Sequence, residues 1–126
     1  QRQMCIRDRY DVEDYGTYTA DSVDYPVYAK KVADAVVKGE VDKGIICCGS
    51  GIGVSIAANK VKGIRAVVCS DTTSARYSRM HNDANVLCMG ERIIGVLTAE
   101  DICRIWLTTE FEGGRHQRRV DMLNEM

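Results

Sequence analysis

The chain has 126 residues, a length that suits one domain with a hydrophobic core of its own. Its 17 basic and 18 acidic side chains give a net charge of −1, which argues against partners bound through bulk positive charge, such as nucleic acids or membrane surfaces. No apolar run approaches the roughly 20 residues of a membrane-spanning helix. The six cysteines include no C-x-x-C pair, so we expect free thiols in a reducing cytoplasm. The two histidines, His81 and His116, lack ligand-type spacing, so no metal site is predicted.

The N-terminal residues do not match the rest of the chain. Residues 1–9 read QRQMCIRDR and show neither strand alternation nor a helical stripe, while residues 10–14 could form a short strand. A parallel α/β domain normally begins with a buried strand and a helix before this point. We therefore expect residues 1–9 to be a non-native segment and residues 10–126 to form the single domain. The chain would then be a fragment that lacks the first strand and most of the first helix.

Helical and strand-like segments alternate through the rest of the sequence. A helix is expected over residues 25–38, because Asp24-Tyr25-Pro26 is a helix-start signal and one stripe carries apolar side chains up to Val37. Further helices are expected from residue 54 to 60, over 71–80 and over 98–107. Between them lie apolar runs at residues 44–48, 66–69 and 86–89, which are rich in Val, Ile and Cys.

This alternation indicates the fold class. The apolar runs lack polar alternation, as expected for parallel strands that are covered on both faces. The predicted architecture is therefore α/β, a three-layer Rossmann-like sandwich with a parallel sheet. In such folds, ligands bind beyond the carboxyl ends of the strands. Cys48, Ser70 and Gly90 are expected at these ends.

A glycine-rich turn follows the first of these strands. Residues 47–53 read CCGSGIG and lead from an apolar run into a helix, where backbone N–H groups attract anions. The spacing matches neither the dinucleotide-binding pattern nor the phosphate-binding loop of nucleotide hydrolases. From the local sequence, a purely structural turn and a turn that carries a catalytic thiol are about equally supported.

Two further segments carry groups suited to a phosphorylated substrate. His81 and Asn82 stand in a turn rich in Asn and Asp, where acid–base chemistry and simple turn formation are both plausible. Arg115 and Arg119 lie four residues apart near a predicted helix start at Gly114, a spacing that suits phosphate recognition. The alternative for the arginines is a solvated basic face or an interface that pairs with acidic groups.

The same segments also carry a family resemblance. Residues 44–71, GIICCGSGIGVSIAANKVKGIRAVVCSD, are followed by ARYSRMHNDANVLCMGERIIG and then by FEGGRHQRRV. These three motifs, in this order, resemble the type B ribose-5-phosphate isomerases, a family that includes galactose-6-phosphate and allose-6-phosphate isomerases. The resemblance runs from about Tyr10 to the C-terminus. It implies interconversion of ribose 5-phosphate and ribulose 5-phosphate without a metal or organic cofactor.

The resemblance also implies roles for particular residues. Cys48 matches the base that moves a proton between C2 and C1 of the open-chain sugar, and Cys47 is expected to be a buried neighbour. Ser50 and His81 match the pair that assists ring opening, and the backbone N–H groups from Gly49 to Gly53 would stabilise the enediolate oxygen. The remaining matches are Tyr25, Gly49, Gly51, Gly53 and Asn82 for the sugar, and Arg92, Arg115 and Arg119 for the phosphate. The family forms homodimers or homotetramers, so some of these groups are expected to act across subunits.

One departure from the family keeps other functions open. Its members usually begin with a strand that carries an Asp-His pair, for which this sequence has no equivalent. A pentose-phosphate isomerase remains the leading hypothesis, with a galactose- or allose-6-phosphate isomerase as the nearest alternative. A non-catalytic sugar-phosphate binding protein is the alternative that the missing pair favours. A thiol redox protein, suggested by the adjacent Cys47 and Cys48, is disfavoured by the absence of C-x-x-C spacing.

Overall fold

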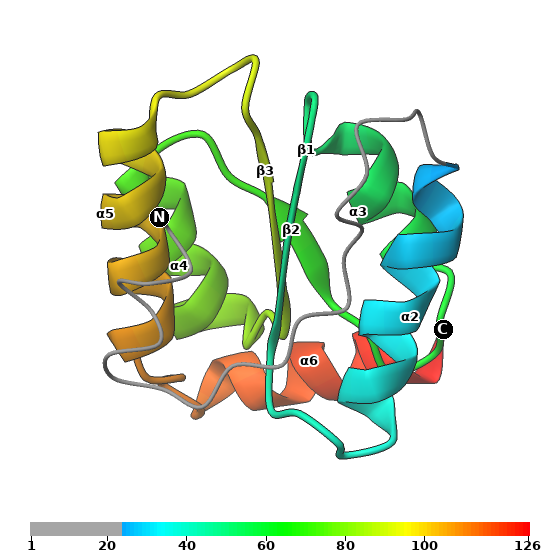
Figure 1. Cartoon of the computed structure of the whole chain (residues 1–126). Coiled ribbons are helices and arrows are strands. Elements are labelled where there is room, and N and C mark those ends of the chain that lie inside the picture. Colours follow the sequence, from blue (N-terminus) through cyan, green and yellow to red (C-terminus); the bar gives the residue numbers. More distant parts are fainter. Residues whose placement is uncertain (1–23) are drawn as a thin grey trace.

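The structure, a computed structural model, describes residues 24–126, so the predictions made for residues 1–23 lie outside the described residues. The described elements are α2 (Tyr25–Val37), β1 (Gly44–Cys48), α3 (Ile52–Ala58), β2 (Ala66–Val68), α4 (Thr72–Asn82), β3 (Val86–Gly90), α5 (Val96–Thr108) and α6 (Arg115–Glu125) (Figure 1). Each strand and helix whose bounds were predicted within residues 24–126 is confirmed to within two residues at either end. Within residues 24–126, none of the helices has both the length and the apolar character that crossing a bilayer requires.

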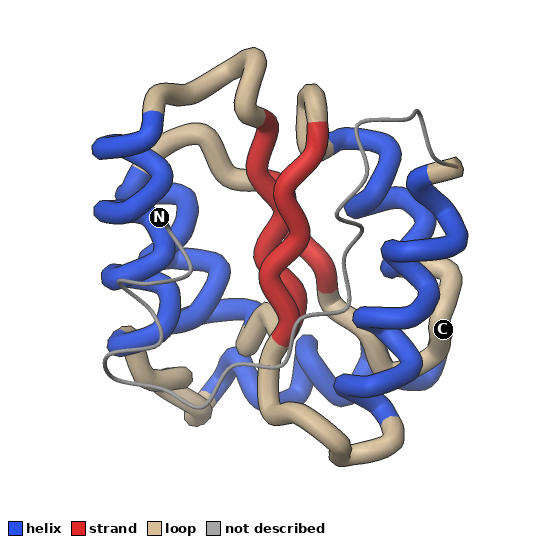
Figure 2. The backbone as a smooth tube through the Cα atoms, viewed as in Figure 1, coloured by secondary structure: helices blue, strands red, loops and turns tan. Residues whose placement is uncertain are grey.

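The three strands form one parallel sheet in the order β1-β3-β2 (Figure 2). Strand β3 is central and buried at all five of its residues, which explains its uninterrupted apolar sequence. In the register of β1 with β3, Gly44 pairs with Val86 and Cys48 pairs with Gly90. The predicted parallel sheet is therefore confirmed, and Cys48 and Gly90 end neighbouring strands at the same edge.

Helices cover both faces of the sheet and complete the three layers (Figure 1). On one face, α2 and α3 pack against Val86 and Cys88, and on the other face α4 and α5 pack against Leu87 and Met89. Because successive side chains of a strand point to opposite faces, these four residues of β3 serve both cores. The last helix, α6, lies across the end of the sheet at which the strands begin (Figure 1).

Two predictions about side-chain burial are wrong. Val37, placed on the apolar stripe of the first helix, is 43% exposed, because α2 ends there and its buried side chains are Ala29, Ala33 and Ala35. Cys47, expected to be a buried neighbour of Cys48, is exposed. It lies near the end of β1, an outer strand of the sheet that the described residues form.

Candidate active site

The thiol of Cys48 lies at the carboxyl end of β1, at the start of a tight turn. Gly51 adopts a φ of +81° in this turn, which turns the chain into α3. The backbone N–H of Gly51 donates a hydrogen bond to Cys48 Sγ at 3.1 Å. The Ser50 hydroxyl oxygen accepts from the backbone N–H of Ile52 at 3.2 Å. An N–H donor aimed at the sulfur stabilises negative charge there when the thiolate forms.

Close packing against β3 explains why this turn needs glycine. A Cβ atom on Gly90 would stand 2.5 Å from the carbonyl oxygen of Ser50, and one on Gly51 would stand 2.9 Å from the backbone carbonyl carbon of Met89. The turn is also tied down by hydrogen bonds from Glu91 N–H to the Cys48 carbonyl (2.8 Å) and from Arg92 N–H to the Gly49 carbonyl (3.0 Å). The glycines of the turn therefore have a structural role. The closely packed turn in turn holds the Cys48 thiol in place.

Two predicted binding residues lie beside the same turn. A Cβ atom on Gly49 would lie 3.7 Å from Arg92 Nε, so the guanidinium of Arg92 borders the turn. The ring of Tyr25 reaches Gly53, where a Cβ atom would lie 2.9 Å from the tyrosine hydroxyl. We call this set the thiol half-site, which consists of Tyr25, Cys48, Gly49, Ser50, Gly51, Gly53 and Arg92.

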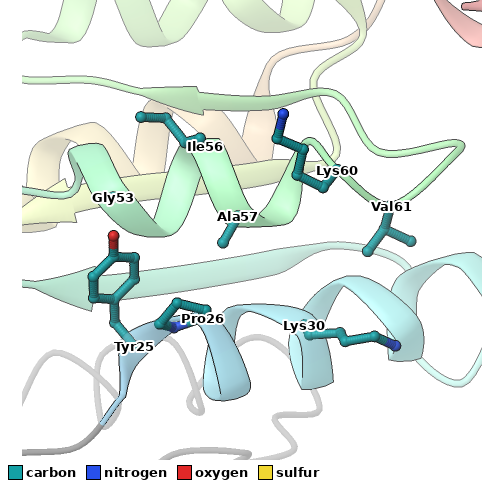
Figure 3. Close-up of a pocket in the computed structure, with 8 residues that line it drawn as sticks. All are labelled: Tyr25, Pro26, Lys30, Gly53, Ile56, Ala57, Lys60 and Val61. Atoms are coloured by element: carbon teal, nitrogen blue, oxygen red, sulfur yellow. The ribbon is translucent and has the colours of Figure 1, made fainter.

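An open groove runs between α2 and α3, next to the thiol half-site (Figure 3). It has a volume of about 400 Å³ and a mostly apolar lining. Tyr25 stands at one end with its hydroxyl pointing toward Gly53, whereas Lys30 extends from α2 and Lys60 from the turn that follows α3 (Figure 3). Of the predicted site residues, only Tyr25 and Gly53 line this groove.

His81 and Asn82 lie at the carboxyl end of α4, in a turn held by two arginines, of which Arg79 is buried. Arg79 donates to the carbonyl of Ala84 at 2.6 Å and forms an ion pair with Asp83 at 2.8 Å. Asp83 adopts a left-handed conformation, with φ of 47°, and ends the helix. Arg65 donates to the Asp83 carbonyl at 2.9 Å from the other side. The Asn- and Asp-rich turn therefore has a clear structural role, and it fixes the position at which His81 leaves the helix.

The ring of His81 belongs to a cluster that joins three segments. It stacks on Tyr77 of the same helix and on His116 of α6, with ring centroids 5.0 and 4.2 Å apart. One oxygen of Glu112 lies 3.7 Å from His81 Nε2 and 3.6 Å from His116 Nε2. Desolvation of the ring, followed by the charges of His81 and Arg115, lowers the pKa of His116 from its ordinary value.

The two predicted arginines of α6 complete this second set. Arg115 and Arg119 lie in the first two turns of the helix that carries His116, and both are exposed. The Arg119 guanidinium donates to the Arg115 carbonyl at 3.4 Å, which keeps the pair on one side of α6. We call His81, Asn82, Glu112, Arg115, His116 and Arg119 the histidine half-site.

The two half-sites lie at opposite ends of the parallel strands. Cys48 pairs with Gly90 at the carboxyl end of β3, whereas His81 and Asn82 precede Val86 at its amino end. The four residue steps of β3 between these ends span about 13 Å at ~3.3 Å per residue. The structure thus groups Cys48, Ser50, Tyr25 and Arg92 on one side and the remaining predicted side chains on the other. It does not bring the two groups together within one chain.

Glu112 and His116 belong to the histidine half-site but were not predicted from the sequence as site residues. His116 is 35 residues away from His81 in the sequence, so no local spacing links them. A signal was present in the four-residue spacing of Glu112 and His116, which places Glu112 just before the first turn of α6 and His116 within it. Tyr77 shows the corresponding spacing to His81 along α4.

Burial distinguishes the thiols from one another. Desolvation raises the pKa of Cys69 to about 11 and that of Cys88 to about 12. These two cysteines are therefore protonated near neutral pH and enclosed in the core. Among these described thiols, Cys47 and Cys48 are the accessible candidates, and the Gly51 N–H hydrogen bond distinguishes Cys48.

Comparison with known proteins gives a consistent answer. The family model described as Ribose/Galactose Isomerase matches residues 2–123. Ribose-5-phosphate isomerase B of Escherichia coli (strain K12) is 55% identical over 113 residues, which cover 90% of this chain and 76% of that protein. A solved structure of Clostridium thermocellum ribose-5-phosphate isomerase B superposes with a TM-score of 0.94 at 53% identity, covering 98% of this chain and 83% of that one.

A third relative carries a ligand. The crystal structure of ribose-5-phosphate isomerase B from Mycoplasma genitalium with bound ribulose-5-phosphate has a TM-score of 0.92 at 39% identity, covering 98% of this chain and 83% of that one. The family match extends over nearly the whole sequence, and the sequence and structural relatives agree with it. The chain belongs to the ribose/galactose isomerase family.

Proposed function

We propose that the chain interconverts ribose 5-phosphate and ribulose 5-phosphate, with Cys48 as the proton-transfer base. The observation that carries this proposal is the Cys48 thiol, held at the carboxyl end of β1 with the Gly51 N–H directed at its sulfur. The relatives from Escherichia coli and Clostridium thermocellum bear the name ribose-5-phosphate isomerase B, and the one from Mycoplasma genitalium binds ribulose-5-phosphate.

The proposed reaction begins with opening of the furanose ring. His81 and Ser50 handle the protons of this step, in which the anomeric hydroxyl loses a proton and the ring oxygen gains one. The Cys48 thiolate then removes the proton from C2, and the electron pair moves to form the enediolate. The same sulfur returns the proton to C1 while the hydroxyl proton on O2 moves to O1, which yields the ketose. Backbone N–H groups of residues 49–53 that are not already bonded to Cys48 Sγ or Ser50 Oγ would stabilise the developing oxyanion without reorganisation.

The phosphate and the sugar hydroxyls require further groups. We assign Arg115 and Arg119 to the phosphate, because two guanidinium groups on one side of α6 provide a fork of charged donors. Arg92 would contribute positive charge from the thiol half-site. Asn82 and Tyr25 would bind sugar oxygens, one from each half-site.

We further propose that each active site is shared by two copies of the chain. Cys48 and His81 act on neighbouring atoms of one small sugar, yet they stand at opposite ends of the parallel strands. A twofold-symmetric pair solves this problem, since the thiol half-site of each copy can face the histidine half-site of the other. Exposed apolar side chains beside the thiol half-site, such as Ile52 and Ile56, provide surface that a second copy would cover.

The experiment that tests the proposed function is an isomerisation assay on three sugar phosphates. We expect kcat/KM to be at least ~10-fold higher for ribose 5-phosphate than for allose 6-phosphate or galactose 6-phosphate, because the hexose phosphates add a carbon that the pocket must accommodate. A preference for either hexose phosphate would assign the chain to the other branch of the family. Binding of ribose 5-phosphate without turnover of any of the three would contradict the proposal and indicate a sugar-phosphate binding protein.

A further inference from the structure

The cluster of His81, Glu112 and His116 joins side chains of the kinds that bind transition metals. One ligand atom from each residue can be chosen so that all three lie within 4.8 Å of one another. Two imidazole nitrogens and one carboxylate oxygen form a ligand set found in zinc proteins. We propose that this cluster is a binding site for a divalent transition-metal ion such as Zn²⁺.

The two distances to the carboxylate oxygen are close to those that such an ion requires. Glu112 Oε1 lies 3.7 Å from His81 Nε2 and 3.6 Å from His116 Nε2. In a tetrahedral zinc site with bonds of about 2.0–2.1 Å, neighbouring ligand atoms lie about 3.4 Å apart. The carboxylate is therefore already within a few tenths of an ångström of its required distance from both imidazoles.

One rotation completes the site. A metal ion lies in the plane of each imidazole that binds it, whereas the rings of His81 and His116 are stacked, with an interplanar angle of 15°. One ring must therefore turn about χ2, a torsion with a broad energy profile. The His81 side chain is 35% exposed, and its turn toward solvent would give up the stacking on Tyr77 and His116.

The backbone around the cluster holds the three residues in place. The backbone N–H of Glu112 donates to the carbonyl of Met80, next to His81, at 3.1 Å, and the N–H of His116 donates to the Gly113 carbonyl at 3.0 Å. Imidazole nitrogens with a single carboxylate favour zinc and related ions over magnesium or calcium. The exposed guanidinium groups of Arg115 and Arg119 on the same helix oppose a cation, so we expect micromolar rather than tighter affinity.

Metal binding would prevent His81 from acting in ring opening, a consequence that rests on the proposed function. A metal ion on His81 Nε2 occupies the lone pair that the imidazole needs to exchange a proton in ring opening. Three protein ligands leave a fourth position for water or a substrate oxygen. We expect Zn²⁺ to inhibit isomerisation and a chelator to restore it.

Equilibrium dialysis of the full chain against Zn²⁺ tests the site independently of catalysis. The variants are Glu112→Gln and His116→Asn, with Glu110→Gln as the matched control, since Glu110 is an exposed carboxylate two residues away. All variants retain the six cysteines, so zinc held by thiols is the same in each. We expect Glu112→Gln and His116→Asn each to lose about one bound ion per chain, or to bind it at least tenfold more weakly, while Glu110→Gln matches the wild type. Zinc binding by Glu112→Gln and His116→Asn equal to that of the wild type would overturn the proposal.

Discussion

Replacing Cys48 with alanine is expected to lower kcat for ribose 5-phosphate by about 10²–10⁴-fold, the usual contribution of a positioned general base. The variant lacks the proposed base, the sulfur that accepts a hydrogen bond from the Gly51 N–H. Substrate binding should change little, because the proposed phosphate and hydroxyl contacts come from other residues. The measurement is steady-state isomerisation together with a direct binding assay on the same preparations.

Cys47→Ala is the matched control for this prediction. Cys47 precedes Cys48 and is exposed, but its side chain lies on the opposite face of β1. We expect Cys47→Ala to keep kcat within a few-fold of the wild-type value. Equal kcat values for Cys48→Ala and the wild type would remove the thiol from the mechanism.

Replacing Arg79 with methionine is expected to lower the free energy of unfolding by about 3 kcal/mol. The guanidinium is buried, donates to the carbonyls of Ala84 and Thr109, and lies 5.8 Å from the centre of the Trp106 ring. Methionine keeps most of the aliphatic volume but leaves both carbonyls without this donor. The loss of the ion pair with Asp83 should add little to this destabilisation, because Asp83 is partly exposed and retains a contact with Arg65 at 3.5 Å.

Urea unfolding at a fixed protein concentration measures this effect, since any association of subunits would make the midpoint depend on concentration. Arg76→Met is the control, because Arg76 lies on the same helix with an exposed side chain. We expect its unfolding midpoint to stay close to that of the wild type. If both variants unfold at the same urea concentration, the buried network does not anchor the turn that carries His81.

Most of the fold could be predicted because its signals are local. The apolar run of β3 and the helix-start signal at Asp24-Tyr25-Pro26 each determine an element within a few residues. The wrong predictions concern how elements cover one another. Cys47 belongs to an apolar run that favours burial. The exposure of its side chain depends on how the helices pack against β1, an outer strand of the described sheet.

The candidate site was predictable in part for the same reason. That Cys48 and Gly90 lie at one edge follows from parallel strands, and the structure confirms it. The separation of the two half-sites also has a sequence signal, because residues just before Val86 must lie at the end of the sheet where the strands begin. The position of α6 has no such signal, since the order of the strands does not fix the path of this helix. The meeting of His81 with Glu112 and His116 therefore required the tertiary structure.

The shared active site is the central claim, and subunit complementation tests it most directly. Cys48→Ala and His81→Ala are each expected to be nearly inactive alone. After the two are unfolded together and refolded, half of the pairs should be mixed, and each mixed pair holds one site with both Cys48 and His81. We predict recovery of about a quarter of wild-type activity from this arithmetic for a twofold-symmetric pair. A mixture no more active than its two components would contradict the claim that each site takes its thiol from one copy and its histidine from the other.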